Sequence, residues 1–221
     1  TKPAVLDHDP LFESGNLLLE SIPPGAEVDP ASGAYVARME EAVARGGFRM
    51  GLNLFSSPIY YADAETPRYD VTLTALKANP TDPAWGYCNK QKILDVPIPD
   101  FAEADSSSDG RLMIVDRDAQ CVYEVWRYGL PTWLSNIPRR AGWASAIPIQ
   151  SDGTYPRGAI SAGTAANVAA PNGLIWPDEL IAGRIPHALV FGYEAMSITS
   201  AGSVVPATKT DGQSSDPDAL P

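Results

Sequence analysis

The chain has 221 residues, 44% of them hydrophobic, which suits one large all-β domain or two small ones, and we expect a single domain over residues 1–221. Sixteen basic side chains against 27 acidic ones give a net charge of −11, which argues against nucleic acid as a partner because that affinity comes mostly from Lys and Arg. No apolar run of about 18 residues occurs, so we expect no membrane insertion.

The first predicted element is an amphipathic helix from Ser32 to Arg45, and it should be the longest helix of the chain. Its apolar positions recur with helical spacing at Val36, Met39 and Val43. Ser32 is the predicted cap, and the two glycines after Arg45 tolerate the positive φ at which helices end. A second, short helix is predicted at 177–182, where Pro177 suits the first helical position.

Short apolar runs separated by Pro and Gly, 21 and 18 in number, are typical of a β-sandwich or jelly roll. We therefore predict an all-β fold with more than twice as many strand as helix residues. The predicted strands are Phe48–Leu54, Ile59–Tyr61, Tyr69–Leu76, a hairpin at 111–127, Trp143–Gln150, His187–Met196 and, more weakly, Val204–Ala207.

The hairpin at 111–127 carries the main functional hypothesis. Its strands run over 111–116 and 121–127, around a turn at 117–120. Alternation along the second strand puts Val122, Glu124 and Trp126 on one face and Cys121, Tyr123 and Val125 on the other. The second of these faces carries no charge, so we expect it to face the core. The Glu124 face should then line a cleft, with Glu124 and Trp126 partly exposed.

A carboxylate beside an exposed indole suits a sugar-binding cleft, and Glu124 is the predicted acid/base residue. A glycosidase needs a second carboxylate about 5–9 Å away, for which Asp116, Asp118 and Asp152 are candidates. His187 is the predicted second proton carrier, because histidine changes charge near neutral pH. A packed structural role is the competing interpretation for Glu124 and for His187.

Substrate binding is assigned to two indoles, Trp126 and Trp143, and to Asp116 and Asp118 at the hairpin turn. Turn aspartates commonly accept backbone N–H bonds, so a structural role competes for Asp116 and Asp118. The loop indoles Trp85 and Trp133 could be sugar platforms or anchors that pack their loops on the core. No metal-ligand spacing, nucleophile motif or phosphate-binding glycine loop occurs, and we expect no metal and no cofactor.

Two features of the sequence bear on the cellular compartment of the protein: its two cysteines and its first residues. Cys88 and Cys121 are too few for a disulfide framework, and one bridge in a secreted protein or two buried free thiols both remain open. Residues 1–4 contain no hydrophobic signal core and fit a mature or trimmed end.

Several motifs resemble a group of secreted bacterial proteins common in actinobacteria and myxobacteria, over roughly residues 48–221. They are Asn53-x-Phe55-x-x-Pro58-Ile59-Tyr60, Asp116-Arg117-Asp118, Glu124-Val125-Trp126, Ser151-Asp152-Gly153-Thr154, Pro156-x-Gly158, Gly173-Leu174-Ile175-x-Pro177-Asp178-Glu179-Leu180 and Gly183-Arg184-Ile185-x-His187-Ala188-Leu189. The resemblance implies a jelly-roll-like β-sandwich in an extracellular location, and it implies no particular activity. It also implies that the chain continues past Pro221 into another strand.

Residues 202–221 are rich in Ser, Asp, Pro, Thr and Gly, and they read as a loop or tail without a closing strand. A truncated chain and a disordered tail are both open. The leading hypothesis is an extracellular protein that engages polysaccharide, as a glycoside hydrolase or polysaccharide lyase. The alternatives are a non-enzymatic surface, filament or matrix subunit that pairs with a partner chain, and a lectin-like module. A groove with two carboxylates and an indole would favour the enzyme, whereas a buried Glu124 would favour assembly.

Overall fold

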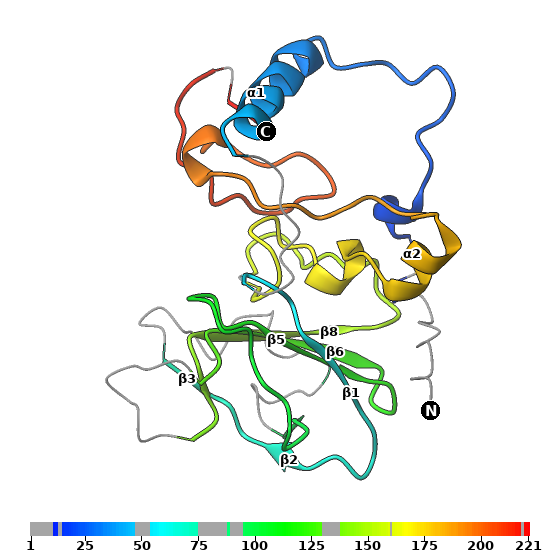
Figure 1. Ribbon diagram of the computed structural model, residues 1–221, viewed down its shortest axis with the longest axis vertical. Coiled ribbons are helices and arrows are strands. Elements are labelled where there is room, and N and C mark those ends of the chain that lie inside the picture. Colours follow the sequence, from blue (N-terminus) through cyan, green and yellow to red (C-terminus); the bar gives the residue numbers. More distant parts are fainter. Residues whose placement is uncertain are drawn as a thin grey trace.

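The fold is mainly β, with two short helices (Figure 1). The computed structural model describes residues 11–12, 15–46, 54–74, 88, 95–129, 138–159, 161–217 and 219–221. The strands are β1 Ile59–Ala62, β2 Arg68–Tyr69, β3 Thr72–Leu73, β4 Val96–Pro97, β5 Leu112–Asp116, β6 Cys121–Trp126, β7 Arg140–Ala141 and β8 Trp143–Pro148. The helices are α1 Ser32–Ala44 and α2 Pro177–Ala182, with 3₁₀ turns at Leu17–Leu19, Ala170–Gly173 and Ala195–Ser197.

A four-stranded sheet in the order β1-β5-β6-β8 forms the centre of the molecule. The predicted hairpin is confirmed as β5 and β6, which pair antiparallel, and β8 adds antiparallel to β6. Strand β1 joins parallel to β5, so the sheet is mixed. Two small ladders, β2 with β4 and β3 with β7, complete the strands in the described part of the chain. The β-sandwich or jelly-roll architecture remains a prediction.

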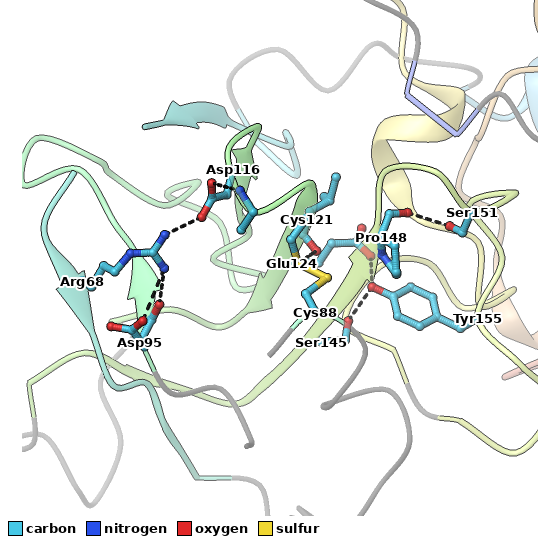
Figure 2. The surroundings of a disulfide bond; sticks show 12 residues. Arg68, Cys88, Asp95, Asp116, Cys121, Glu124, Ser145, Pro148, Ser151 and Tyr155 are labelled. Atoms are coloured by element: carbon cyan, nitrogen blue, oxygen red, sulfur yellow. Dashed lines mark hydrogen bonds and ion pairs between the residues drawn. A yellow bond between two sulfur atoms is a disulfide. The ribbon is translucent and has the colours of Figure 1, made fainter. Parts of the chain in front are cut away.

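Both faces of the central sheet are buried, because separate parts of the chain cover each one. Residues opposite each other in an antiparallel ladder share a face, so Glu124 shares its face with Ser145, and Cys121 shares the other with Asp116. The Glu124 face lies under residues 151–159 and 161–173. The Cys121 face lies against the β2–β4 ladder and Cys88 (Figure 2). The expectation of one core face and one open face was therefore wrong.

The two helices begin and end largely as their sequences predict, with one correction. Ser32 is the first residue of α1 rather than its cap; Asp29 organises the entry instead, because its side chain accepts from the Ala31 N–H at 2.7 Å. Helix α2 begins at Pro177 and ends at Ala182, and the next residue, Gly183, has a φ of 69°, the left-handed value that glycine adopts at low cost.

Several predicted strands are shorter than expected or do not form. The predicted strand Tyr69–Leu76 is interrupted: β2 and β3 pair with different partners, and residues 75–76 lie outside the described part. The segment His187–Met196 is not a strand, since the Ala188 N–H bonds to Leu18 and the Val190 N–H to Gly173 instead of to one neighbouring strand. Residues 204–207 form a turn.

Two further expectations concern the amount of strand and the end of the chain. Of the predicted strand Phe48–Leu54, only Leu54 is described, and it lies in a bend. Among the described residues, strand exceeds helix by less than the expected factor of two. The C-terminal segment is folded onto the chain, with bridges from Ile198 to Leu220 and from Thr199 to Ser214.

Candidate functional site

Glu124 lies in the middle of β6 and is fully buried. Its side chain points into the layer between the central sheet and the segments 151–159 and 161–173, on the same face as Ser145 of β8. This position contradicts the expectation that Glu124 is partly exposed in a cleft. The face assignment from strand alternation was correct, but the charge on that face does not mark it as open to solvent.

Hydrogen bonds satisfy both carboxylate oxygens of Glu124 (Figure 2). The Tyr155 hydroxyl donates to Oε2 at 2.7 Å, and the Ala170 N–H donates to Oε1 at 2.7 Å. Ser145 Oγ donates to the Tyr155 oxygen at 3.0 Å and itself accepts from the Ala162 N–H at 2.8 Å. The result is a connected polar network in the interior, of the kind that fixes one arrangement of the groups around it.

Burial raises the pKa of Glu124 to about 6, because a carboxylate loses hydration in the interior. The hydrogen bonds from Ala170 and Tyr155 and the charge of Arg111 act in the opposite direction and limit the rise. Burial also raises the pKa of Tyr155 well above its usual value, and the neighbouring Glu124 charge adds to that rise. Tyr155 is therefore a neutral hydrogen-bond donor to Glu124 throughout the physiological pH range.

Gly163 lets the backbone approach the Glu124 carboxylate closely. A Cβ atom at this position would lie 2.7 Å from Glu124 Oε2 and 2.8 Å from the Val168 carbonyl oxygen. Arg111 also contacts this glycine, since its Nη1 donates to the Gly163 carbonyl at 2.5 Å. Residue 163 must therefore lack a side chain for the network to form.

Asp152 does not join Glu124. It lies exposed on a turn, where its Oδ1 accepts from the Thr154 N–H at 2.8 Å. A surface hollow of about 380 Å³ lies beside it, lined by Ile147, Pro148, Ser151, Asp152, Thr154, Tyr155, Pro156 and Thr208. Glu124 is sealed in the core and does not line this hollow, so the pair expected of a glycosidase is not formed.

His187 lies apart from Glu124, against helix α2. Its Nε2 is 2.9 Å from Oε1 of Glu179, and both side chains are almost completely buried. The contact has the distance of an ion pair but not the geometry of a hydrogen bond, and Nε2 makes none with the described residues. Oε2 of Glu179 accepts from the Trp176 N–H at 2.9 Å. Sequence reasoning missed Glu179 as the partner, although an acidic residue two positions after Pro177 is a typical helix-start signal.

The predicted sugar platforms are packed side chains. Trp143 is 6% exposed. Trp126, directly opposite it in the ladder, is partly buried, and its Nε1 donates to Asp109 at 3.1 Å. The guanidinium of Arg127 lies 5.3 Å from the centre of the Trp126 ring. Both indoles thus pack against neighbouring groups of the sheet and the hairpin rather than lining an open groove. The loop indoles Trp85 and Trp133 lie outside the described residues.

The two turn aspartates separate into a buried and an exposed group. Asp116 is fully buried and forms an ion pair with Arg68 Nη2 at 2.7 Å, while its Oδ1 accepts from the Ala119 N–H at 2.9 Å (Figure 2). Asp118 is exposed at the hairpin turn. Neither lies in a groove with Trp126 or Trp143, and the contacts of Asp116 are structural.

Comparison of the chain with protein-family models, with curated proteins and with solved structures found no match. The resemblance to secreted bacterial proteins therefore stays a prediction. Within the described ranges, no group of three or more His, Cys, Asp or Glu side chains could hold a metal ion. No helix in that part of the chain is long and apolar enough to cross a membrane.

Proposed function

We propose that this chain is a non-enzymatic extracellular subunit that assembles with further copies of itself through an exposed apolar surface. The surface is centred on the apolar face of helix α1, at Val36, Met39 and Val43, and we call it the assembly surface. Burial of Glu124 removes the main support for catalysis on the hairpin face, because a polysaccharide chain cannot reach a sealed carboxylate.

The distribution of exposed apolar side chains carries the proposal. Six of the exposed large hydrophobic residues lie in 17–43, eight in 180–205 and only three elsewhere in the described chain. Helix α1 contains no buried residue, and Val36 and Val43 on its apolar face are 53% and 47% exposed. Figure 1 places α1 beside the C-terminal part of the chain, on the side of the sheet opposite β2 and β3. A large exposed apolar surface typically marks a protein–protein contact.

An extracellular location is supported by the disulfide between Cys88 and Cys121. Disulfides form and persist in oxidising compartments and are rare in the cytosol. The bridge resolves the choice between a disulfide and two free thiols in favour of the disulfide, and it accords with the secreted location that the sequence resemblance implies.

The net charge of −11 predicts how self-assembly should depend on salt concentration. Copies of the same acidic chain repel one another at low ionic strength, and salt screens this repulsion. Association through the assembly surface should therefore strengthen with added salt, whereas association driven by ion pairs would weaken.

The test is sedimentation velocity over a wide range of protein concentration, at low and at high salt. We expect concentration-dependent oligomers that grow with salt. The double variant Val36→Glu/Val43→Glu should weaken association by about 100-fold, because two valines that would be buried are replaced by charges. The matched control is Ala34→Glu/Ala37→Glu, which adds the same charge at exposed positions of α1 outside its apolar line. A wild-type chain that stays monomeric throughout, or equal losses in both variants, would refute the proposal.

Carbohydrate binding without catalysis is the second candidate, favoured by one aromatic side chain. Phe101, in the loop between β4 and β5, is 76% exposed, and its ring meets that of Tyr60 edge-on with centroids 5.9 Å apart. An exposed aromatic plate of this kind can stack on a sugar ring. Retention on insoluble polysaccharides should then be lost in Phe101→Ala and kept in Phe55→Ala, another exposed phenylalanine. Equal retention of the two variants would exclude this surface.

A further inference from the structure

Residues 151–159 and 161–173, here called the covering segment, lie over the Glu124 face with mostly small side chains. The buried alanines of the segment are Ala159, Ala162, Ala169 and Ala170. Small side chains remove little apolar area from water, so they hold the segment only weakly. Tyr155 is the largest fully buried side chain of the segment, and the Tyr155 hydroxyl donates its hydrogen bond to Glu124. Attachment of the segment to the sheet therefore relies heavily on polar contacts.

Glu124 is the point at which two distant parts of the covering segment meet the sheet. Tyr155, near the start of the segment, donates to one carboxylate oxygen, and the Ala170 N–H, near its end, donates to the other. A third contact, from the Ala162 N–H to Ser145 Oγ, belongs to the same network through the Tyr155 hydroxyl. The state of one carboxyl group therefore affects how firmly the whole segment is held.

We propose that the covering segment is a pH-sensitive lid, held closed over the sheet while Glu124 is protonated and opening more readily once Glu124 is ionised. An ionised carboxylate gains hydration when the lid lifts, and two hydrogen bonds in the interior do not replace that hydration. The protonated form stays satisfied when the lid is closed, because the Tyr155 hydroxyl can rotate to donate to Ser145 Oγ while its oxygen accepts the hydrogen bond from the carboxyl O–H. Besides Tyr155, Arg111 is the charged or titratable group of the described chain that acts on Glu124.

The size of the effect follows from the difference between the closed and the open state. The pKa of Glu124 is about 6 with the lid closed, against an ordinary value of 4.5 for a solvated carboxyl. The opening equilibrium is constant below the lower value, rises between the two and is constant again above the higher one. A difference of about 1.5 units corresponds to about 30-fold more opening at high pH.

Hydrogen exchange of the Ala162 and Ala170 amides, corrected for the intrinsic pH dependence of exchange, tests the proposal. Their protection should fall by about 30-fold between about pH 4 and about pH 8. At every pH it should stay below the protection of the β6 and β8 amides, because the lid opens without unfolding the sheet. Glu124→Gln should make the protection of the lid amides independent of pH. The exposed Asp152→Asn, on the same segment, should leave the pH dependence as in the wild type.

Tyr155→Phe keeps the test decisive if Glu124→Gln does not fold. This variant removes a hydrogen bond that favours the ionised carboxylate, so the fall in protection should move to higher pH. Lid amides whose protection is independent of pH in the wild type, or equal to that of the sheet amides at all pH values, would overturn the proposal. So would a Tyr155→Phe midpoint that stays in place or moves to lower pH. None of these outcomes depends on the oligomeric state, so they are separable from the test of the assembly surface.

Discussion

Arg68 of β2 reaches across to Asp116 at the end of β5, and the 2.7 Å contact between Nη2 and Oδ2 joins the small β2–β4 ladder to the central sheet. The two partners differ in exposure. The Asp116 side chain is fully buried, whereas 31% of the Arg68 side chain remains accessible. Arg68 also donates to the backbone carbonyl of Asp95 at 2.8 Å, so the arginine ties three parts of the chain together.

This asymmetry predicts unequal costs for removing the two partners. Arg68→Met should lower the free energy of unfolding by about 3–5 kcal/mol, because it leaves the Asp116 carboxylate buried and unpaired. Asp116→Asn should cost only about 1–2 kcal/mol, since Arg68 can turn its charge toward solvent. Urea unfolding of both variants measures the difference. Equal losses, or a larger loss for Asp116→Asn, would show that the pair is less buried than described.

Gly163→Ala tests the close approach of the backbone to Glu124. The added methyl group would overlap the carboxylate and the Val168 carbonyl, and we expect a loss of about 2–3 kcal/mol in unfolding free energy. The control is Gly33→Ala in α1, where a Cβ would meet nothing within 4 Å. That change should be neutral or stabilise by up to about 1 kcal/mol, because alanine favours a helix. A tolerated Gly163→Ala would contradict the packing around Glu124.

The raised pKa of Glu124 predicts how global stability changes with pH. A carboxyl whose pKa is higher in the folded than in the unfolded state stabilises the fold at low pH, and this contribution is lost as pH rises through the folded-state value. The wild type should therefore lose about 2 kcal/mol relative to Glu124→Gln between about pH 4 and about pH 8. Unfolding of both proteins across this range measures the difference. A gap between the two curves that does not change with pH would place Glu124 in contact with water.

Reduction of the disulfide should destabilise the chain strongly. Cys88 and Cys121 are 33 residues apart in sequence, and closing a loop of that size lowers the entropy of the unfolded chain, which is worth about 3–4 kcal/mol. The variant Cys88→Ala/Cys121→Ala should show a similar loss and no further response to a reducing agent. Stability that is the same with and without reductant in the wild type would speak against the bridge.

The hairpin could be predicted from sequence because its information is local. Alternation of apolar residues and a polar turn define β5 and β6, and helical spacing of Val36, Met39 and Val43 defines α1 in the same way. Alternation also grouped the β6 side chains correctly into two faces, although the expectation that one of these faces is open was wrong. In each case residues close in sequence are sufficient to determine the element.

The burial of Glu124 could not be predicted because its partners are distant in sequence. Tyr155 and Ala170 lie 31 and 46 residues away, and no local pattern announces that they converge on one carboxylate. The burial of His187 was missed for a different reason: Glu179 is only eight residues away in sequence, but no local pattern indicates that helix α2 presents it to the histidine. Its segment alternates like a strand, but the backbone bonds of Ala188 and Val190 go to two different parts of the chain. A charged residue in a strand therefore indicates exposure only when no residue distant in sequence supplies it with hydrogen bonds or an opposite charge.

The parallel pairing of β1 with β5 has a consequence for the order in which the chain folds. Ile59 aligns with Met113, so a long stretch of chain separates the two strands that pair here. Strands β5 and β6, in contrast, are joined by a short turn. Closing a long loop lowers the chain entropy before any strand contact offsets the loss, and such pairings therefore form slowly. The hairpin should therefore act as the template, with β8 added early and β1 last. Until β1 docks, the outer edge of β5 is unpaired, and this is the interval in which the nascent chain is most exposed to aggregation.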